Sequence, residues 1–215
     1  MKVLLHVGCG SFDIRHLPAY FQDGSWDELR YDINEAVEPD LIGTLQDMSM
    51  IEDGTIDAIY SSHNIEHVWS FEVPQVLAEF MRVLKPDGFA VVLCPDILSV
   101  AQAITKGFLG QTLYMSPAGP ISAIDIMYGF QHDIEKGNLF MAHKTAFTAQ
   151  TLAAALAAGG FAGSAVARDR GFGLYSVATK NAWDEALIKN LIDALHPADE
   201  YVLERLRFGC YTPSV

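Results

Sequence analysis

Short apolar runs alternate along the chain with segments whose apolar positions recur at helical spacing. The runs predict strands at residues 3–7, 26–33, 40–43, 55–61 and 89–94, followed by a strand pair at 162–168 and 174–179. The helical spacing predicts helices at 74–84, 97–106 and 149–158, and Asp96 and Thr148 stand where N-caps are expected. Residues 85–88 (Lys-Pro-Asp-Gly) predict a turn. Short apolar strands separated by helices are typical of α/β folds with a mostly parallel sheet.

The first strand runs directly into Gly8-Cys9-Gly10. Glycines at this point allow a sharp turn and a close approach of the backbone to a ligand, and ligands of open α/β sheets bind outside the carboxyl ends of the strands. A dinucleotide site would have a third glycine where this chain has Asp13, an acid that can face a positively charged ligand. No phosphate-binding Gly-x-x-x-x-Gly-Lys motif occurs either. We therefore expect a nucleotide-type ligand, with an NAD-dependent oxidoreductase as the less favoured alternative.

Two acidic residues follow the next two predicted strands. Asp32 ends the second strand 22 residues after Gly10, close to the spacing of about 20 residues at which a carboxylate accepts hydrogen bonds from ribose hydroxyls. Asp47 lies in a turn after the short third strand. A solvated strand end would also explain Asp32, and an ordinary turn residue would explain Asp47.

An ordered set of segments carries a family resemblance: VGCG, YDI, LQDM, DAIYSSHNIEH and RVLKPDGFAVVLCPD. In this order and spacing they resemble the class I S-adenosylmethionine (SAM)-dependent methyltransferases. The segments MYGFQ (127–131) and HKxxFT (143–148) look like a type 11-like subgroup of small predicted methyltransferases. The resemblance covers roughly residues 3–180. It implies an α/β, Rossmann-like sandwich with a mostly parallel seven-stranded sheet and a final antiparallel strand.

The resemblance also implies SAM as cofactor, S-adenosylhomocysteine (SAH) as its product, and a set of cofactor-binding residues. Gly8 and Gly10 would pass under the methionine portion, and Asp32 would accept the ribose hydroxyls. Asp47 would face the adenine amino group, with Met48 packed against the ring. Ser62 and His63 would lie near the methionine end and the transferred methyl group.

A chain of 215 residues fits one α/β domain. We assign residues 1–180 to the SAM-binding domain, with an insert at about 107–142 that shapes the acceptor pocket. Residues 181–215 form a C-terminal helical extension, helical over 183–206 with a break near 196–197, whose apolar stripe covers the sheet or, less favoured, forms a dimer contact. We expect a monomer or homodimer. Because Met1 lies almost on the first strand, the insert or a neighbouring subunit would cover the cofactor.

Charge and composition bear on partners and location. Lys and Arg number 14 against 27 Asp and Glu, giving a net charge of −13, whereas nucleic-acid substrates call for a basic face. A small neutral or cationic acceptor, such as a sugar, a lipid-linked sugar or a metabolite, fits better. No apolar run reaches the roughly 20 residues that span a bilayer, and no signal peptide is visible. With three cysteines at no metal-like spacing, we expect a cytoplasmic protein.

Methyl transfer requires in-line alignment, and a hydroxyl acceptor also requires a base. His67 and His143 are the expected catalytic residues, ahead of His63 and His132, because a neutral imidazole can take a proton near pH 7. Tyr128 could orient the acceptor. No compact cluster of metal-ligand type occurs in the sequence, so no metal is expected. Two alternatives stay open. One is a non-catalytic SAM-binding module; the other is aminopropyl transfer, which residues 61–64 disfavour because they lack acidic groups.

Overall fold

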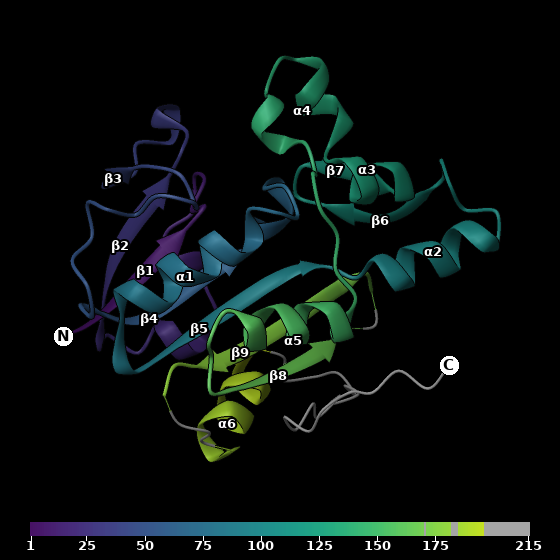
Figure 1. Ribbon diagram of the computed structural model, residues 1–215. Coiled ribbons are helices and arrows are strands. Elements are labelled where there is room, and N and C mark those ends of the chain that lie inside the picture. Colours follow the sequence, from purple (N-terminus) through teal and green to yellow (C-terminus); the bar gives the residue numbers. More distant parts are fainter. Residues whose placement is uncertain (170, 182–184, 196–215) are drawn as a thin grey trace.

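The computed structural model describes residues 1–169, 171–181 and 185–195. A seven-stranded sheet with the order β3-β2-β1-β4-β5-β9-β8 forms its centre (Figure 1). Five strands are mutually parallel: β1 (Lys2–Val7), β2 (Trp26–Asp32), β3 (Leu41–Ile42), β4 (Ile56–Ser62) and β5 (Leu84–Pro95). The last strand, β9 (Gly173–Thr179), runs antiparallel between β5 and β8 (Gly163–Arg168). The predicted fold class is confirmed, including the antiparallel final strand.

The expected turn at residues 85–88 is wrong. The strand β5 begins at Leu84, immediately after helix α1 (Val73–Val83), and continues through these residues. Leu84 pairs with Ile56, but the next pairs join Phe89 to Ala58, so the extra residues are accommodated as a register shift within the sheet. Proline at position 86 lacks an N–H, and an irregular ladder tolerates that loss.

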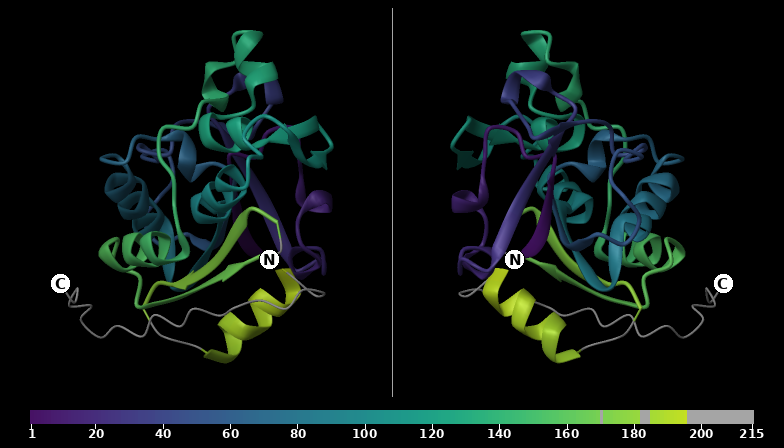
Figure 2. Two further views of the ribbon diagram at one scale, coloured as in Figure 1. Left: turned by 90° about the vertical axis from the view of Figure 1, so that its right-hand side faces the viewer. Right: turned by 90° about the vertical axis from the view of Figure 1, so that its left-hand side faces the viewer.

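Helices cover both faces of the sheet because alternate strand residues point to opposite sides. On one face, Leu5 and Val92 belong to a core with α1 and α5 (Ala149–Ala158). On the other face, Leu4 and Val91 pack with α6 (Glu185–Leu195), which lies on the opposite side of the sheet (Figure 2). Thr148 caps α5 with a capping box, as predicted.

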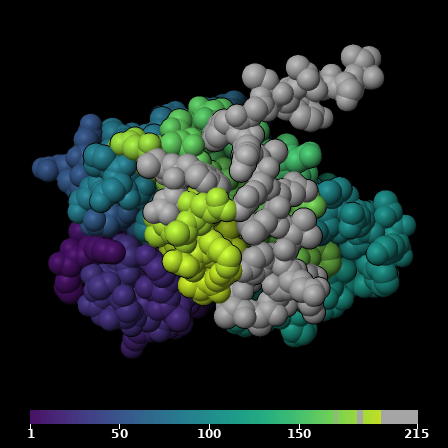
Figure 3. Space-filling model, turned by 90° about the horizontal axis from the view of Figure 1, so that it is seen from below, coloured from purple at the N-terminus to yellow at the C-terminus, as the bar shows by residue number. Residues whose placement is uncertain are grey.

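The helix α6 carries the apolar stripe of the C-terminal segment. Ile188, Leu191 and Ile192 are at most 3% exposed, in one cluster with strand residues of the same chain. The stripe therefore covers the parent sheet, and the outer surface of α6 is visible in Figure 3. The remainder of the predicted helix, residues 183–184 and 196–206, lies outside the described residues.

The segment 107–142 forms a small unit beyond the end of β5. It contains the hairpin β6 (Thr112–Ser116) and β7 (Gly119–Ser122), the helices α3 (Ala123–Tyr128) and α4 (Gln131–Glu135), and a short 3-10 turn at Leu139–Met141. Ile121 and Ile126 pack against Val100 of α2 (Ile97–Thr105), which gives this unit its own apolar cluster. Asp96 caps α2, as predicted. We call residues 107–142 the insert (Figure 1).

Among the described residues, no helix has the length and apolarity required to cross a membrane.

Candidate functional site

The glycine turn after β1 borders a small cavity at the carboxyl ends of three neighbouring strands. We call it the glycine-turn cavity. Its volume is about 140 Å³, less than the roughly 300–1,000 Å³ that small-molecule pockets usually enclose, so a larger ligand would extend along the open sheet edge. Its lining residues come from the turn, the ends of β2 and β3, the loop after β4, the end of the insert and the segment after it: Val7, Gly8, Tyr31, Asp32, Ile33, Gly43, Thr44, Leu45, Gln46, Asn64, His67, Val68, Phe140 and Lys144.

Both turn glycines adopt a left-handed backbone conformation, with φ of +65° at Gly8 and +53° at Gly10. A Cβ atom on Gly8 would collide with the side-chain amide of Asn64. Glycine is therefore required here for two reasons, the backbone conformation and the close packing of Asn64.

Asp32 connects the first two loops of the sheet. Its two carboxylate oxygens each accept one backbone N–H at 2.8 Å, from Gly10 and from Asn34. A carboxylate offers about four lone-pair sites, so acceptor capacity for ligand hydroxyls is left after these two bonds. The residue is only 9% exposed but lines the cavity. This geometry fits a ligand that carries a pair of hydroxyl groups.

Arg30 holds the same loops in place, a role that the sequence reasoning missed. Its guanidinium donates to four carbonyl oxygens, those of Gly10, Phe12, Val37 and Glu38, at 2.7–3.1 Å. Alternation along β2 could have indicated that Arg30 shares the sheet face of Asp32, but no pattern identifies four backbone partners.

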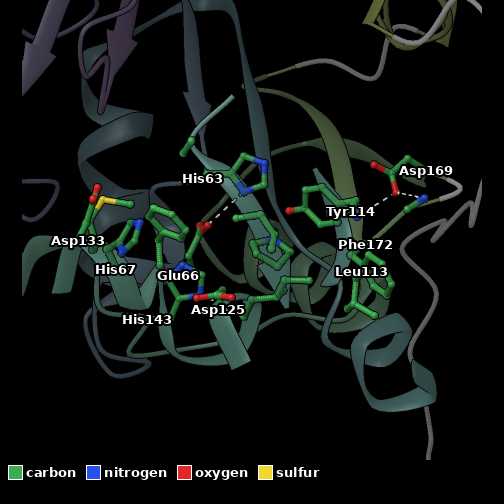
Figure 4. A pocket seen from close by; sticks show the side chains of 18 of the residues that line it. His63, Glu66, His67, Leu113, Tyr114, Asp125, Asp133, His143, Asp169 and Phe172 are labelled. Carbon is green, nitrogen blue, oxygen red and sulfur yellow. Dashed lines mark hydrogen bonds and ion pairs between the residues drawn. The ribbon is translucent and has the colours of Figure 1, made fainter. Parts of the chain in front are cut away.

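A second, larger cavity lies between the carboxyl ends of β4 and β5 and the insert. We call it the insert cavity. Its volume is about 590 Å³, within the range of small-molecule pockets. One wall carries Glu66, His67 and His143, and the opposite wall carries Tyr114, Asp169 and Phe172 (Figure 4). The rings of Tyr114 and Phe172 stack at a centroid distance of 6.1 Å. His67 lines both cavities, so the two adjoin at this side chain.

The wall at Glu66 is an ionisable cluster that joins two adjacent residues, Glu66 and His67, to the distant His143. Glu66, His67 and His143 each place one potential ligand atom within 4.8 Å of the others. The pKa of Glu66 is lowered, because the three neighbouring imidazoles (His63 included) outweigh its burial. Burial lowers the pKa of His143, an effect that Glu66 only partly offsets, so its neutral form is favoured. The sequence predicted no compact cluster of metal-ligand type, but folding brings His143 next to Glu66 and His67 and forms one.

The structure also places the remaining predicted site residues. Asp47 is exposed and outside both cavities, with its carboxylate accepting the Ser49 backbone N–H, and Met48 is fully buried in the core. Ser62 ends β4 outside both cavities. His63 lines the insert cavity rather than the glycine-turn cavity.

Three side chains that sequence considerations singled out serve elsewhere. Asp13 caps the 3-10 turn at Ile14–His16 and pairs with Arg15, which lowers the pKa of this carboxyl. His132 is exposed on α4, and Tyr128, at the end of α3, is 58% exposed; both lie outside the two cavities.

His63 has a left-handed backbone, with φ of +51°, which is uncommon for a residue other than glycine. Its Nδ1 lies 3.4 Å from Oε1 of Glu66. This neighbouring carboxylate raises the pKa of His63, whose side chain is itself 56% exposed. Strained backbone beside a buried carboxylate is typical of functional sites.

Comparisons with known proteins agree with this geometry. Residues 5–92 match the family model of a methyltransferase domain. The fold is similar to that of a protein from Pyrococcus horikoshii OT3, with 15% sequence identity and a TM-score of 0.57, covering 84% of this chain and 82% of that one. It is also similar to a SAM-dependent methyltransferase from Methanosarcina mazei, with 17% identity and a TM-score of 0.56, covering 83% and 92%. Among curated proteins, no match was found.

The matched domain contains the glycine turn, Asp32 and the Glu66–His67 pair, and it ends within β5. A further similar structure, a SAM-dependent methyltransferase from Archaeoglobus fulgidus, has 13% identity and a TM-score of 0.53, covering 83% of this chain and 86% of that one. The structural likenesses establish the fold, which is that of SAM-dependent methyltransferases of known structure. The family match is to a methyltransferase domain and is confined to residues 5–92.

Proposed function

We propose that this protein moves the methyl group of SAM to an oxygen atom of a small-molecule acceptor held in the insert cavity. One observation carries the proposal: His67 lines both the cavity at the glycine turn and the insert cavity. A methyl donor in the first cavity would therefore adjoin an acceptor in the second. Bound SAM supplies an activated methyl sulfonium, so the protein's own task is alignment and removal of a proton.

The residues around each cavity suggest how the two ligands are held. Gly8 and Gly10 give SAM an uncrowded backbone, and Asp32 offers acceptors to its ribose. Phe140 brings the insert to the edge of this cavity, which supports the expectation that the insert covers part of the cofactor. We propose that Asp47, Met48, Ser62 and His63, none of which lines the glycine-turn cavity, contribute to cofactor binding only through the loops that they belong to.

The acceptor class follows from size, lining and charge. A cavity of about 590 Å³ with aromatic and carboxylate groups suits a sugar, a lipid-linked sugar or a metabolite. The net charge of −13 disfavours a nucleic-acid substrate. We propose a cytoplasmic protein, monomeric or homodimeric, with residues 1–180 as the catalytic domain and residues 181–215 as an extension of it.

His67 and His143 are the side chains best placed to act on the acceptor. Each ring has its Nδ1 near a backbone carbonyl oxygen, at 3.2 Å from Ala142 and 2.8 Å from Ile126 respectively. When Nδ1 carries the proton, Nε2 keeps a lone pair that can interact with an acceptor group.

Two variants separate cofactor binding from methyl transfer. The assay incubates the protein with methyl-labelled SAM and a panel of sugars, lipid-linked sugars and metabolite extracts, and detects labelled products by mass spectrometry. Tyr114→Ala, which changes only the insert cavity, should keep SAH affinity and lose transfer. Asp32→Ala should lose affinity for SAH. Labelled nucleic acid, or SAM binding without any methylated small molecule, would contradict the proposal.

A further inference from the structure

The three residues at the junction of the cavities have the composition of a metal site. Glu66 supplies a carboxylate, and His67 and His143 supply imidazoles. Both imidazoles direct Nδ1 toward a backbone carbonyl, the arrangement that fixes the tautomer of metal-binding histidines and leaves Nε2 for the metal. Their rings meet edge to face with centroids 4.9 Å apart, so the two imidazoles are direct neighbours.

Glu66 is the second, independent observation. The residue is 1% exposed, yet neither carboxylate oxygen has a hydrogen-bond partner within the described part of the chain. Its closest charged neighbour, His63, approaches to 3.4 Å without forming a hydrogen bond. The ion pair with His63 leaves the hydrogen-bonding capacity of this buried carboxylate unused, and buried charges are normally hydrogen-bonded as well as paired, or coordinate a metal. In Figure 4 the carboxylate of Glu66 points toward His63, and His67 and His143 lie beside the same side chain.

The backbone holds the cluster together. The main-chain oxygen of Glu66 accepts the N–H groups of Lys144 and Thr145, at 2.8 and 3.2 Å, which docks the segment after the insert onto the loop after β4. His143 is further held by the hydrogen bond from its N–H to the main-chain oxygen of Tyr128. These contacts position His143 beside Glu66 and do not depend on any ligand.

We infer that Glu66, His67 and His143 bind one divalent first-row transition-metal ion at the boundary between the two cavities. Mixed imidazole and carboxylate ligands suit Zn²⁺ and its neighbours in this row, whereas Mg²⁺ and Ca²⁺ favour oxygen ligands. Ligand atoms in a tetrahedral site with metal–ligand distances near 2.1 Å lie about 3.4 Å apart. In the structure the potential ligand atoms lie within 4.8 Å of one another. Side-chain rotations that move these atoms by about 1 Å would bring them to the tetrahedral spacing.

Three protein ligands leave a coordination position open, as in catalytic metal sites. Here that position would face the insert cavity, which the same three residues line. An ion with an open position could act on the acceptor, and this role of the ion rests on the proposed function. A hydroxyl acceptor bound to the ion would lose its proton to solvent more readily. The oxygen would then form its bond to the methyl carbon as the carbon–sulfur bond breaks and SAH leaves. His67 and His143 would act as ligands instead of bases.

Metal binding can be measured without knowing the acceptor. The untagged full chain, stripped with a chelator, is titrated with Zn²⁺ by calorimetry, and with Co²⁺ by visible absorption. We expect one ion per chain and Co²⁺ absorption bands that Zn²⁺ removes. Glu66→Gln and His143→Ala should each weaken Zn²⁺ binding at least about tenfold. His132→Ala, which removes an exposed histidine outside the cavities, is the matched control and should bind like the parent chain.

Two results would overturn the inference: absence of stoichiometric binding by the parent chain, or equal affinity in the parent, Glu66→Gln and His143→Ala proteins. The Co²⁺ spectrum of the parent chain needs no variant, so a misfolded variant cannot hide the answer. SAH calorimetry on the same samples separates this inference from the proposed function. If the parent chain binds SAH and transfers methyl groups but does not bind Zn²⁺, the metal site is refuted and the proposed function stands. If it binds Zn²⁺ but methylates no small molecule, the proposed methylation is refuted and the metal site stands.

Discussion

Replacing Asp32 with alanine tests whether one carboxylate both builds the cofactor site and binds the cofactor. In the structure, Asp32 accepts the backbone N–H groups of Gly10 and Asn34, each at 2.8 Å. Gly10 belongs to the turn after β1 and Asn34 to the loop after β2. The substitution therefore releases both loops from each other and removes the acceptor expected for the ribose hydroxyls.

The expected magnitudes follow from these contacts. A hydrogen bond to a charged group contributes about 1.5–3 kcal/mol, but the two released N–H groups are only half-buried and can bind water. We therefore expect the free energy of unfolding to fall by about 2–3 kcal/mol in total. Losing the ribose contacts should weaken SAH binding about ten- to a hundredfold, which corresponds to about 1.4–2.7 kcal/mol.

Urea denaturation followed by tryptophan fluorescence gives the first quantity, since Trp26 is buried at the start of β2, and calorimetry with SAH gives the second. Asp23→Ala is the matched control, because Asp23 is an exposed acid outside both cavities that accepts the backbone N–H of Ser25. It should leave SAH affinity unchanged. If Asp32→Ala binds SAH as tightly as the parent chain, or if the control loses as much affinity, the assignment of the ribose acceptor is refuted.

Other positions give equally direct tests. Gly8→Ala should cost at least about 1–2 kcal/mol of stability and lower SAH affinity, because it strains a left-handed residue and displaces Asn64; unchanged melting and binding would contradict this. Leu191→Ala should lower the unfolding free energy by about 2–5 kcal/mol in urea titrations, because Leu191 is fully buried against the sheet. A change in oligomeric state alone would favour a dimer contact instead. Burial lowers the pKa of His6, although its hydrogen bond to Glu28 opposes this. As the pH falls, the unfolded chain therefore takes up a proton at His6 before the folded chain does. Stability should therefore fall as the pH drops below about 6.5, and His6→Asn should flatten this part of the urea-derived profile; identical slopes would refute it.

The succession of strands along the chain and the positions of the glycine turn and Asp32 were predictable from the sequence. Local chemistry determines these features, because apolar runs of strand length, glycines and helix caps act over a few residues. The cap at Thr148 and the closing strand pair are examples, and both are confirmed. Even here, residues 85–88 look like a turn, and only the strand β5, which pairs with β4 on either side of them at Leu84 and Phe89, shows that they lie within one strand.

Tertiary structure decided which distant side chains meet. Local sequence around Asp47 and Met48 could not show that one is exposed and the other fully buried. Nothing near position 66 indicates a partner at position 143, because their approach depends on hydrogen bonds between two separate backbone segments. Local patterns in the sequence thus predict the fold class and the turn and acid at the sheet edge. The cluster at the boundary of the two cavities exists only because folding joins a loop after β4 to the end of the insert.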